Sequence, residues 1–233
     1  QRAVGQDLQA DAQKYLFGPV GIPRSSYIWL RDRAHNTYGY ANLFMPPVHF
    51  AKLGLLMQHG GVWDGKRLLS TAYISRLRTP TKTNGCYGYL FWVNGGKTCT
   101  SANIPAAQTV NGQLIGSAPK DLYAMVGALQ QNNFIIPSLH MTVTWTGVLG
   151  DTSVNLAGIL SASGTGSDLY YNFFRLLMRG VQDQHIADPG PFTTPPLDLD
   201  VNPINYLSPA VLLRDLAPNA HCNILICRSD PSG

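Results

Sequence analysis

The stretch "KDLYAMVGALQQNNFIIPSLHMTVTWTG", residues 120–147, decides the fold. Its apolar, aromatic and β-branched runs predict three consecutive strands, at 121–129, 133–137 and 140–147. The polar residues 130–133 are expected to form the turn after the first strand. Gly127 and Ala128 put small residues inside that strand, where a glycine often marks the close approach of a ligand or another backbone. We therefore predict that this strand forms the wall of a binding site.

Helices precede and follow these strands. Apolar residues at helical spacing predict helices within 6–17, 46–61, 70–80 and 166–181. Pro47 suits a first helical turn and Ser70 suits an N-cap. The segments between them predict one more strand at 87–93, a turn at 94–96 and a loop over 97–119. This order predicts an α+β domain with an antiparallel sheet and flanking helices over residues 1–180.

The remaining residues, 181–233, have a different character. They hold eight of the sixteen prolines and no convincing long helix or strand. We expect an extended arm that lies on the surface of the domain or of a partner.

Composition excludes several classes of protein. A hydrophobic fraction of 45% and a charged fraction of 13% indicate a globular chain rather than a disordered one. The net charge of +4 comes from scattered basic residues, without the patch or stripe that a nucleic-acid surface requires. No apolar run approaches the ~20 residues of a membrane span. The cysteines and histidines show no metal-ligand spacing, so we expect neither a metal nor another cofactor.

The four cysteines form two close pairs, Cys86 with Cys99 and Cys222 with Cys227. Disulfides within each pair are the natural interpretation in an oxidising compartment, and free buried thiols are the alternative. The paired state implies a secreted or lumenal protein.

Four segments carry a resemblance to a known family: "YLFGPVGIPRSSYIW" (15–29), "MPPVHFAKLGLLMQHGGVWDGKRLLSTAYISRLRTP" (45–80), "YGYLFWVN" (87–94) and "YAMVGALQQNNFIIPSLHMTVTWTG" (123–147). In this order they resemble the serine β-lactamase-like superfamily, which includes class C β-lactamases, D-alanyl-D-alanine peptidases, some esterases and 6-aminohexanoate-dimer hydrolases. The resemblance covers roughly residues 6–180. It implies the β-lactamase/transpeptidase-like fold, with the N-terminal part of that fold missing from this chain.

The nucleophile motifs of this family, Ser-x-x-Lys and Tyr-x-Asn, precede the first of these segments. We therefore expect them in an N-terminal piece or a companion chain. Two look-alikes occur. Ser117 and Lys120 have the first spacing but come after the helical block and directly before a strand. Tyr40 and Asn42 have the letters of the second motif and fall where the family has a loop bordering the pocket, so we expect them beside the substrate rather than in the chemistry.

The third family motif, Lys-Thr-Gly, falls on Met125, Val126 and Gly127. The resemblance implies that this strand lies at the edge of the pocket and that the N–H of Ala128 completes an oxyanion hole. Met125 replaces the lysine that would bind a substrate carboxylate, and a thioether cannot do this. An ordinary hairpin with a tolerated glycine is the structural alternative.

Two functions follow from these expectations. The first is part of a serine hydrolase that cleaves a small ester or amide through an acyl-enzyme, with its nucleophile supplied by the companion piece. The loss of lysine at Met125 favours the esterase-like or nylon-hydrolase-like branches within that class. The alternative is a catalytically dead relative that serves as a structural or binding subunit.

Overall fold

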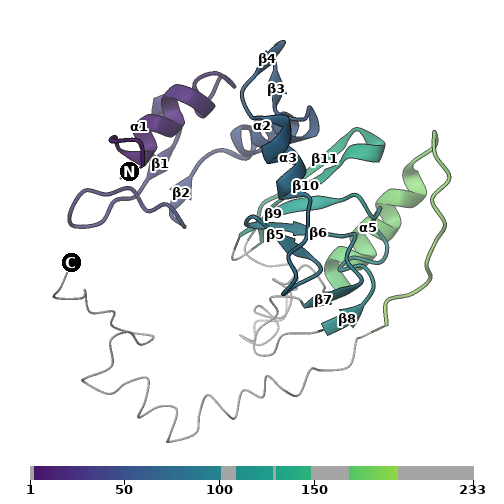
Figure 1. Ribbon diagram of the computed structural model, residues 1–233. Helices are drawn as coiled ribbons and strands as arrows, with labels where there is room; N and C mark the ends of the chain where they lie inside the picture. The colour runs from purple at the N-terminus through teal and green to yellow at the C-terminus, as the bar shows by residue number, and fades with distance from the viewer. Residues whose placement is uncertain (1–2, 101–108, 128–129, 148–167, 194–233) are drawn as a thin grey trace, which may run out of the picture.

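A five-stranded antiparallel sheet forms the centre of the structure (Figure 1). The computed structural model describes residues 3–100, 109–127, 130–147 and 168–193. The strand order is β11-β10-β9-β6-β5. The strands are β5 (Tyr87–Gly88), β6 (Phe91–Val93), β9 (Tyr123–Gly127), β10 (Gln131–Ile136) and β11 (Met141–Trp145). The α+β class with an antiparallel sheet, expected from the sequence, is confirmed.

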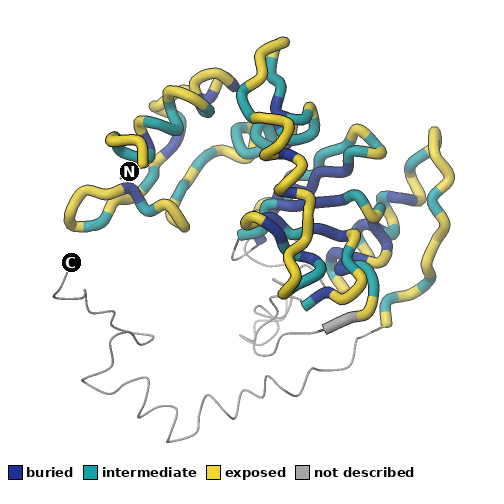
Figure 2. The backbone as a smooth tube through the Cα atoms, viewed as in Figure 1, coloured by how far each residue is buried: buried dark blue, intermediate teal, exposed yellow. Residues whose placement is uncertain are grey.

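One face of the sheet is covered by α5 (Asp168–Gly180). Its residues Tyr170, Phe174 and Met178 lie four apart along one face of the helix and are buried, because that spacing places them in one row. They pack on the side chains of β9, β10 and β11 that point to the same side, among them Ala124 and Phe134. This is the larger core of the molecule, seen as the buried strands beside α5 in Figure 2.

The other face is covered by α2 (Pro47–Gln58) and α3 (Thr71–Leu77). Both begin as the sequence predicts: Pro47 is the first residue of α2, and the Ser70 hydroxyl accepts a hydrogen bond from the N–H of Tyr73. Ile74 and Leu77 of α3 pack with Tyr123 and other residues of the sheet. The sheet is therefore enclosed between one helix and a helical pair.

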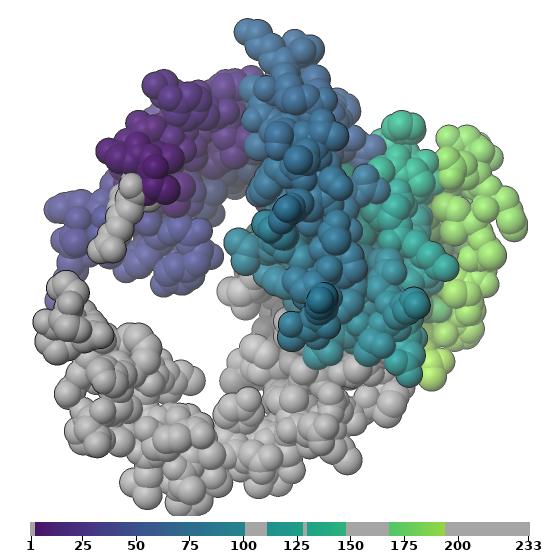
Figure 3. All heavy atoms as spheres, in the orientation of Figure 1, coloured from purple at the N-terminus to yellow at the C-terminus, as the bar shows by residue number. Residues whose placement is uncertain are grey.

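The N-terminal lobe, residues 3–45, packs against α2. It contains α1 (Leu8–Ala12), which continues as a wider π-helical turn (Gln13–Phe17), a short 3-10 helix (Arg24–Ser26), β1 (Ile28–Trp29) and β2 (Leu43–Phe44). Its buried side chains, including Phe17 and Ile22, meet Leu56 of α2. On the opposite side of the two-stranded ribbon, the cross-strand pair Ile28 and Phe44 is exposed. Figure 3 shows open space between the violet residues of this lobe and the blue and teal residues of the sheet and α3.

Three expectations about local structure are wrong. The segment 87–93 forms a hairpin, β5 and β6, rather than one strand. The expected loop at 97–119 contains the hairpin of β7 (Thr98–Thr100) and β8 (Thr109–Asn111). The polar residues 131–133 belong to β10 and not to a turn, because the amides of Asn132 and Asn133 find partners that are distant in sequence; Gln130 is in the turn, at a φ of 65°. The remaining short elements are the hairpin of β3 (Val62–Trp63) and β4 (Lys66–Arg67) and a 3-10 turn (Pro137–Leu139).

The arm is described as far as residue 193, and this part lies along α5. Arg175 pairs with Asp188 at 2.6 Å, and the hydroxyl of Tyr171 donates to the carbonyl of Gly190 at 3.0 Å. Phe192 stacks edge-on against Tyr171. The rest of the predicted arm, including Cys222 and Cys227, lies outside the described residues.

Candidate functional site

The predicted pocket-edge strand, β9, has a free backbone edge at Val126. The N–H of Asn94 donates to the carbonyl of Leu122 at 2.9 Å, so this carbonyl faces β6. Because backbone groups alternate along an antiparallel strand, those of Ala124 and Val126 point to the same edge. Strand β6 reaches only to Ala124, which pairs with Trp92. Among the described residues, Val126 therefore has no strand partner on this edge.

Side chains of β9 alternate between the two faces of the sheet. Val126 packs toward the core under α5, whereas Met125 contacts the cluster of Ile74, Leu77 and Phe91 beneath α3. Met125 is half-buried, and its thioether offers no hydrogen-bond donor to an anion. At this position the chain has a packing residue where the resembled family has a cation. Ala128, the expected oxyanion donor, lies outside the described residues.

The tip of the β5–β6 hairpin borders this edge. Tyr89 and Leu90 connect the two strands, and the register of β6 on β9 places Phe91, the next residue, at the level of Met125. Both tip residues have left-handed φ values, 47° for Tyr89 and 67° for Leu90. Bulky residues rarely adopt this conformation, which suits glycine and asparagine. Both are exposed, Tyr89 by 52% and Leu90 by 81%.

An arginine of α3 holds this tip. The Nη1 group of Arg76 donates to the hydroxyl of Tyr89 at 2.7 Å, and its guanidinium lies 5.7 Å from the centre of the same ring. Sequence reasoning missed Arg76, Tyr89 and Leu90, because neither tip residue is a typical turn residue. The run "YGYLFW" was the available signal, because its aromatic residues are compatible with a hairpin as well as with a single strand.

A second arginine of the α3 region stacks on the sheet. The guanidinium of Arg78 lies 5.5 Å from the ring centre of Tyr123, whose hydroxyl donates to the carbonyl of Met57 at 3.0 Å. Burial raises the pKa of Tyr123 to about 12, so its phenol is protonated at neutral pH. Tyr123 therefore joins the sheet to α2 through the hydrogen bond of its neutral phenol.

Buried amides fix the strand next to β9. The side-chain amide of Asn133 donates to the carbonyl of Phe50 at 2.7 Å and fills the space left by Gly54 of α2. Asn132, on the other face, donates to the hydroxyl of Tyr170. Desolvation by burial raises the pKa of Tyr170, which stays a neutral hydrogen-bonding group. These contacts hold β10, and through it β9, between the helices.

The other predicted pocket residues do not join this site. Tyr40 is 85% exposed and stacks on Tyr38. Asn42 is exposed, and its carbonyl accepts from the N–H of Leu30 within the N-terminal lobe. No hydrogen bond or ring contact links either residue to β9 in the part of the chain that the structure describes.

The Ser-x-x-Lys look-alike has a structural role. The hydroxyl of Ser117 is buried and donates to the carbonyl of Tyr171 at 2.7 Å. Within the described ranges it forms no hydrogen bond with Lys120. This position agrees with its rejection as a nucleophile.

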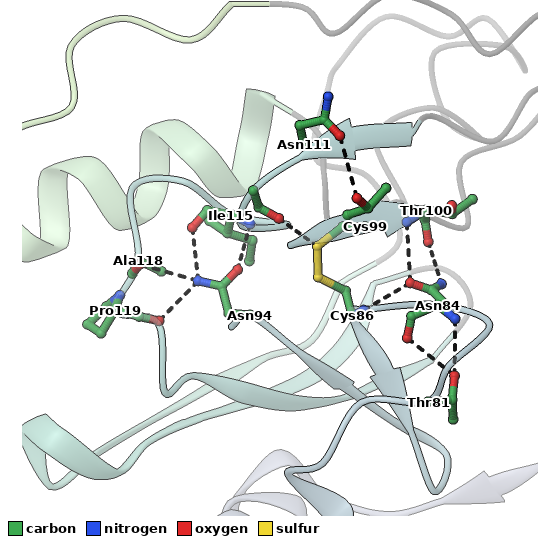
Figure 4. The surroundings of a disulfide bond; sticks show 12 residues. Thr81, Asn84, Cys86, Asn94, Cys99, Thr100, Asn111, Ile115, Ala118 and Pro119 are labelled. Carbon is green, nitrogen blue, oxygen red and sulfur yellow. Dashed lines mark hydrogen bonds between the residues drawn. A yellow bond between two sulfur atoms is a disulfide. The ribbon is translucent and has the colours of Figure 1, made fainter. Parts of the chain in front are cut away.

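A disulfide anchors the segment that carries the hairpin (Figure 4). Cys86 and Cys99 are both buried and bonded, with their Cα atoms 4.9 Å apart, so this predicted pairing is confirmed. Beside it, the buried amide of Asn94 donates to the carbonyls of Ile115, Ala118 and Pro119 and accepts from the N–H of Ile115. The disulfide ties the start of β5 to β7, and the Asn94 amide ties the end of β6 to the loop that leads into β9.

Comparison with family models and with curated proteins gives no match. No family model matches the chain, and no curated protein matches it significantly.

Within the described ranges, no group of three or more His, Cys, Asp or Glu side chains is arranged to hold a metal. The helices there are also too short or too polar for any of them to cross a membrane.

Proposed function

We propose that the chain forms the pocket-edge part of a serine hydrolase that cleaves a small ester or amide through an acyl-enzyme. The observation that supports this most is the free edge of β9 at Val126, which is followed by the small residues Gly127 and Ala128. In this proposal the N–H of Ala128 is one donor of the oxyanion hole, and Gly127 lets the substrate approach the backbone. Backbone donors aimed at a developing oxyanion supply a large part of acyl-transfer catalysis.

The nucleophile of the proposed enzyme comes from an N-terminal companion piece. The family that the sequence resembles carries Ser-x-x-Lys and Tyr-x-Asn there. The exposed apolar pair Ile28 and Phe44 supports a companion, because side chains of this kind on a two-stranded ribbon are stabilised when another segment covers them. The β-lactamase/transpeptidase-like fold belongs to the same proposal.

The disulfide supports a proposal for the compartment. A buried bond between Cys86 and Cys99 is compatible with an oxidising environment, and cytosolic proteins keep such thiols reduced. We therefore propose a secreted or lumenal location.

A catalytically dead subunit is the second candidate. Met125 favours it, because this side chain is packed beneath α3 and has no polar group to offer a substrate. The two candidates differ in one property, the presence of an acyl-enzyme.

Turnover of a 4-nitrophenyl ester by the protein purified with any companion chain tests the first candidate. Ala128→Pro removes the proposed donor and should cost about 2.7–4 kcal/mol of transition-state stabilisation, whereas Ala128→Gly keeps the N–H and should retain most activity. Circular dichroism checks that both variants fold. Equal turnover by two folded variants would show that β9 is not the pocket edge.

A further inference from the structure

We propose that Arg76, held by Tyr89, binds a carboxylate at the end of an apolar ligand chain. This assignment names the substrate class of the site described above and so rests on the proposed function. The group formed by Arg76, Tyr89 and Leu90 is called the Arg76 site below.

The segment of sequence that carries the Arg76 site, between Asp64 and Asp121, is basic. Residues 65–120 contain seven lysines and arginines and no aspartate or glutamate. The ion pairs among the described residues join Asp7 to Arg31 and Arg175 to Asp188, and Arg76 belongs to neither. Its guanidinium is thus a cation without an internal counter-charge in the described structure, in a segment that attracts anions.

The guanidinium is also pre-oriented. Its hydrogen bond to the hydroxyl of Tyr89 uses one of its five N–H donors, and the guanidinium lies beyond that hydroxyl, 5.7 Å from the ring centre. The remaining donors include the fork that matches the two oxygens of a carboxylate. A single fixed arginine suits one carboxylate better than a more highly charged phosphate, which usually gathers several cations.

The neighbouring surface is apolar. Leu90 is largely exposed at the hairpin tip, and Tyr73 lies one turn before Arg76 on the same side of α3 and is also exposed. The two-residue turn between β5 and β6 places Tyr89 and Leu90 in left-handed conformations, which bulky residues rarely adopt. Strained backbone of this kind is concentrated at ligand-binding positions.

The site lies beside the edge of β9. Because Phe91 is at the level of Met125, the tip residue Leu90 is next to the free edge at Val126. A ligand whose scissile carbonyl lies at this edge would extend its apolar chain past Leu90 and place its carboxylate at Arg76. The expected substrates are therefore monoesters or monoamides of aliphatic dicarboxylic acids, with Arg76 in the role that Met125 cannot fill.

A binding experiment tests the Arg76 site without requiring turnover. Adipate is titrated into the isotope-labelled full chain, and the Arg Nε–H and backbone N–H resonances are followed by NMR. Adipamide serves as the neutral ligand of the same length. Adipate should shift the resonances of Arg76 and Leu90, and adipamide should leave Arg76 unchanged.

Variants define the site. Arg76→Gln should weaken adipate binding at least tenfold, and Tyr89→Phe, which keeps the ring and removes the hydroxyl, should weaken it several-fold. Lys82→Gln makes the same change in net charge within the same basic segment and should bind adipate like the wild type. Equal binding of adipate and adipamide, an equal loss in Lys82→Gln, or no binding by the wild type would overturn the proposal.

The results that would reject the proposed function differ from those that would reject the Arg76 site. Adipate binding in a protein that turns over no ester would keep the Arg76 site and remove the hydrolase. Ester turnover that does not discriminate between a 4-nitrophenyl adipate monoester and a neutral 4-nitrophenyl ester would keep the hydrolase and remove the Arg76 site.

Discussion

Gly54 is the point at which α2 approaches the sheet, and Gly54→Ala should be among the most destabilising substitutions in the described structure. A Cβ atom there would lie 2.7 Å from Nδ2 and 2.8 Å from Cγ of Asn133. Asn133 is fully buried and donates to the carbonyl of Phe50 at 2.7 Å, so it cannot move without losing that bond.

The magnitude follows from three contributions. Overpacking a core costs about 1–3 kcal/mol. A buried amide left without its hydrogen bond costs about 1–3 kcal/mol more. Alanine is favoured over glycine within a helix by about 1 kcal/mol, which offsets part of the loss. We expect Gly54→Ala to lower the free energy of unfolding by about 3 kcal/mol, and the melting temperature by about 6–12 °C for a chain of this size.

Urea unfolding followed by circular dichroism measures this change. Gly180→Ala is the control, because Gly180 ends α5 in open space and its substitution should change stability by less than about 0.5 kcal/mol. In an Asn133→Ala background the clash is absent, so Gly54→Ala should cost at least about 1 kcal/mol less there. An equal cost in both backgrounds would refute the claim that Asn133 determines how closely α2 approaches.

Three further outcomes are expected. Replacing Cys86 and Cys99 together by alanine should lower the free energy of unfolding by about 3 kcal/mol, because the unfolded chain is no longer closed into a loop. In urea unfolding, the wild type in reductant should match this variant. An unchanged midpoint would contradict the prediction. In the same assay, Asn94→Ala should lower the free energy of unfolding by about 3 kcal/mol, because it leaves buried carbonyls and one N–H without a partner. A loss below about 1 kcal/mol would show that water replaces the amide. Hydrogen bonds from Arg175 hold the pKa of Asp188 at about 2, below its value near 3.9 in the unfolded chain. The stabilisation that this pair gives the folded state is therefore complete above about pH 4 and is lost as the pH falls through about 2. Asp188→Asn should flatten the melting temperature between pH 4 and pH 2, and an unaltered pH profile would exclude this pair as its cause.

The sequence predicted the elements whose signals are local. Ser70 and Pro47 mark helix starts because a cap and a first-turn proline act within a few residues. The three strands after residue 120 carry runs of apolar and β-branched residues, and all three are found. The pairing of Cys86 with Cys99 also follows from closeness in sequence.

Features that depend on distant partners were not predictable. Asn132 and Asn133 resemble turn residues by composition, yet both are buried in β10. Their partners, Tyr170 and the carbonyl of Phe50, lie on helices that are far away in the chain. The left-handed turn at Tyr89 is a similar case, because neither tip residue is a typical turn residue and the hydrogen-bond partner of Tyr89, Arg76, lies on α3.

The candidate site was predicted in part. The position of β9 and the small residues at its end follow from the sequence, whereas its free edge depends on where β6 stops. Tyr40 and Asn42 were expected beside it and belong to the N-terminal lobe, which packs on α2. A resemblance in linear order does not determine which loops meet in space.

We propose that this chain forms part of a hydrolase that works through an acyl-enzyme, and labelling with a fluorophosphonate tests this proposal most directly. The protein, purified from its native source with any companion chain, is treated with the probe and analysed by intact mass spectrometry and peptide mapping. We expect one covalent adduct on a serine of the N-terminal companion piece, none on Ser117, and slower formation of the adduct while an excess of ester substrate is present. The absence of any adduct on the complete native material, together with the absence of ester turnover, would contradict the account and leave a catalytically dead subunit.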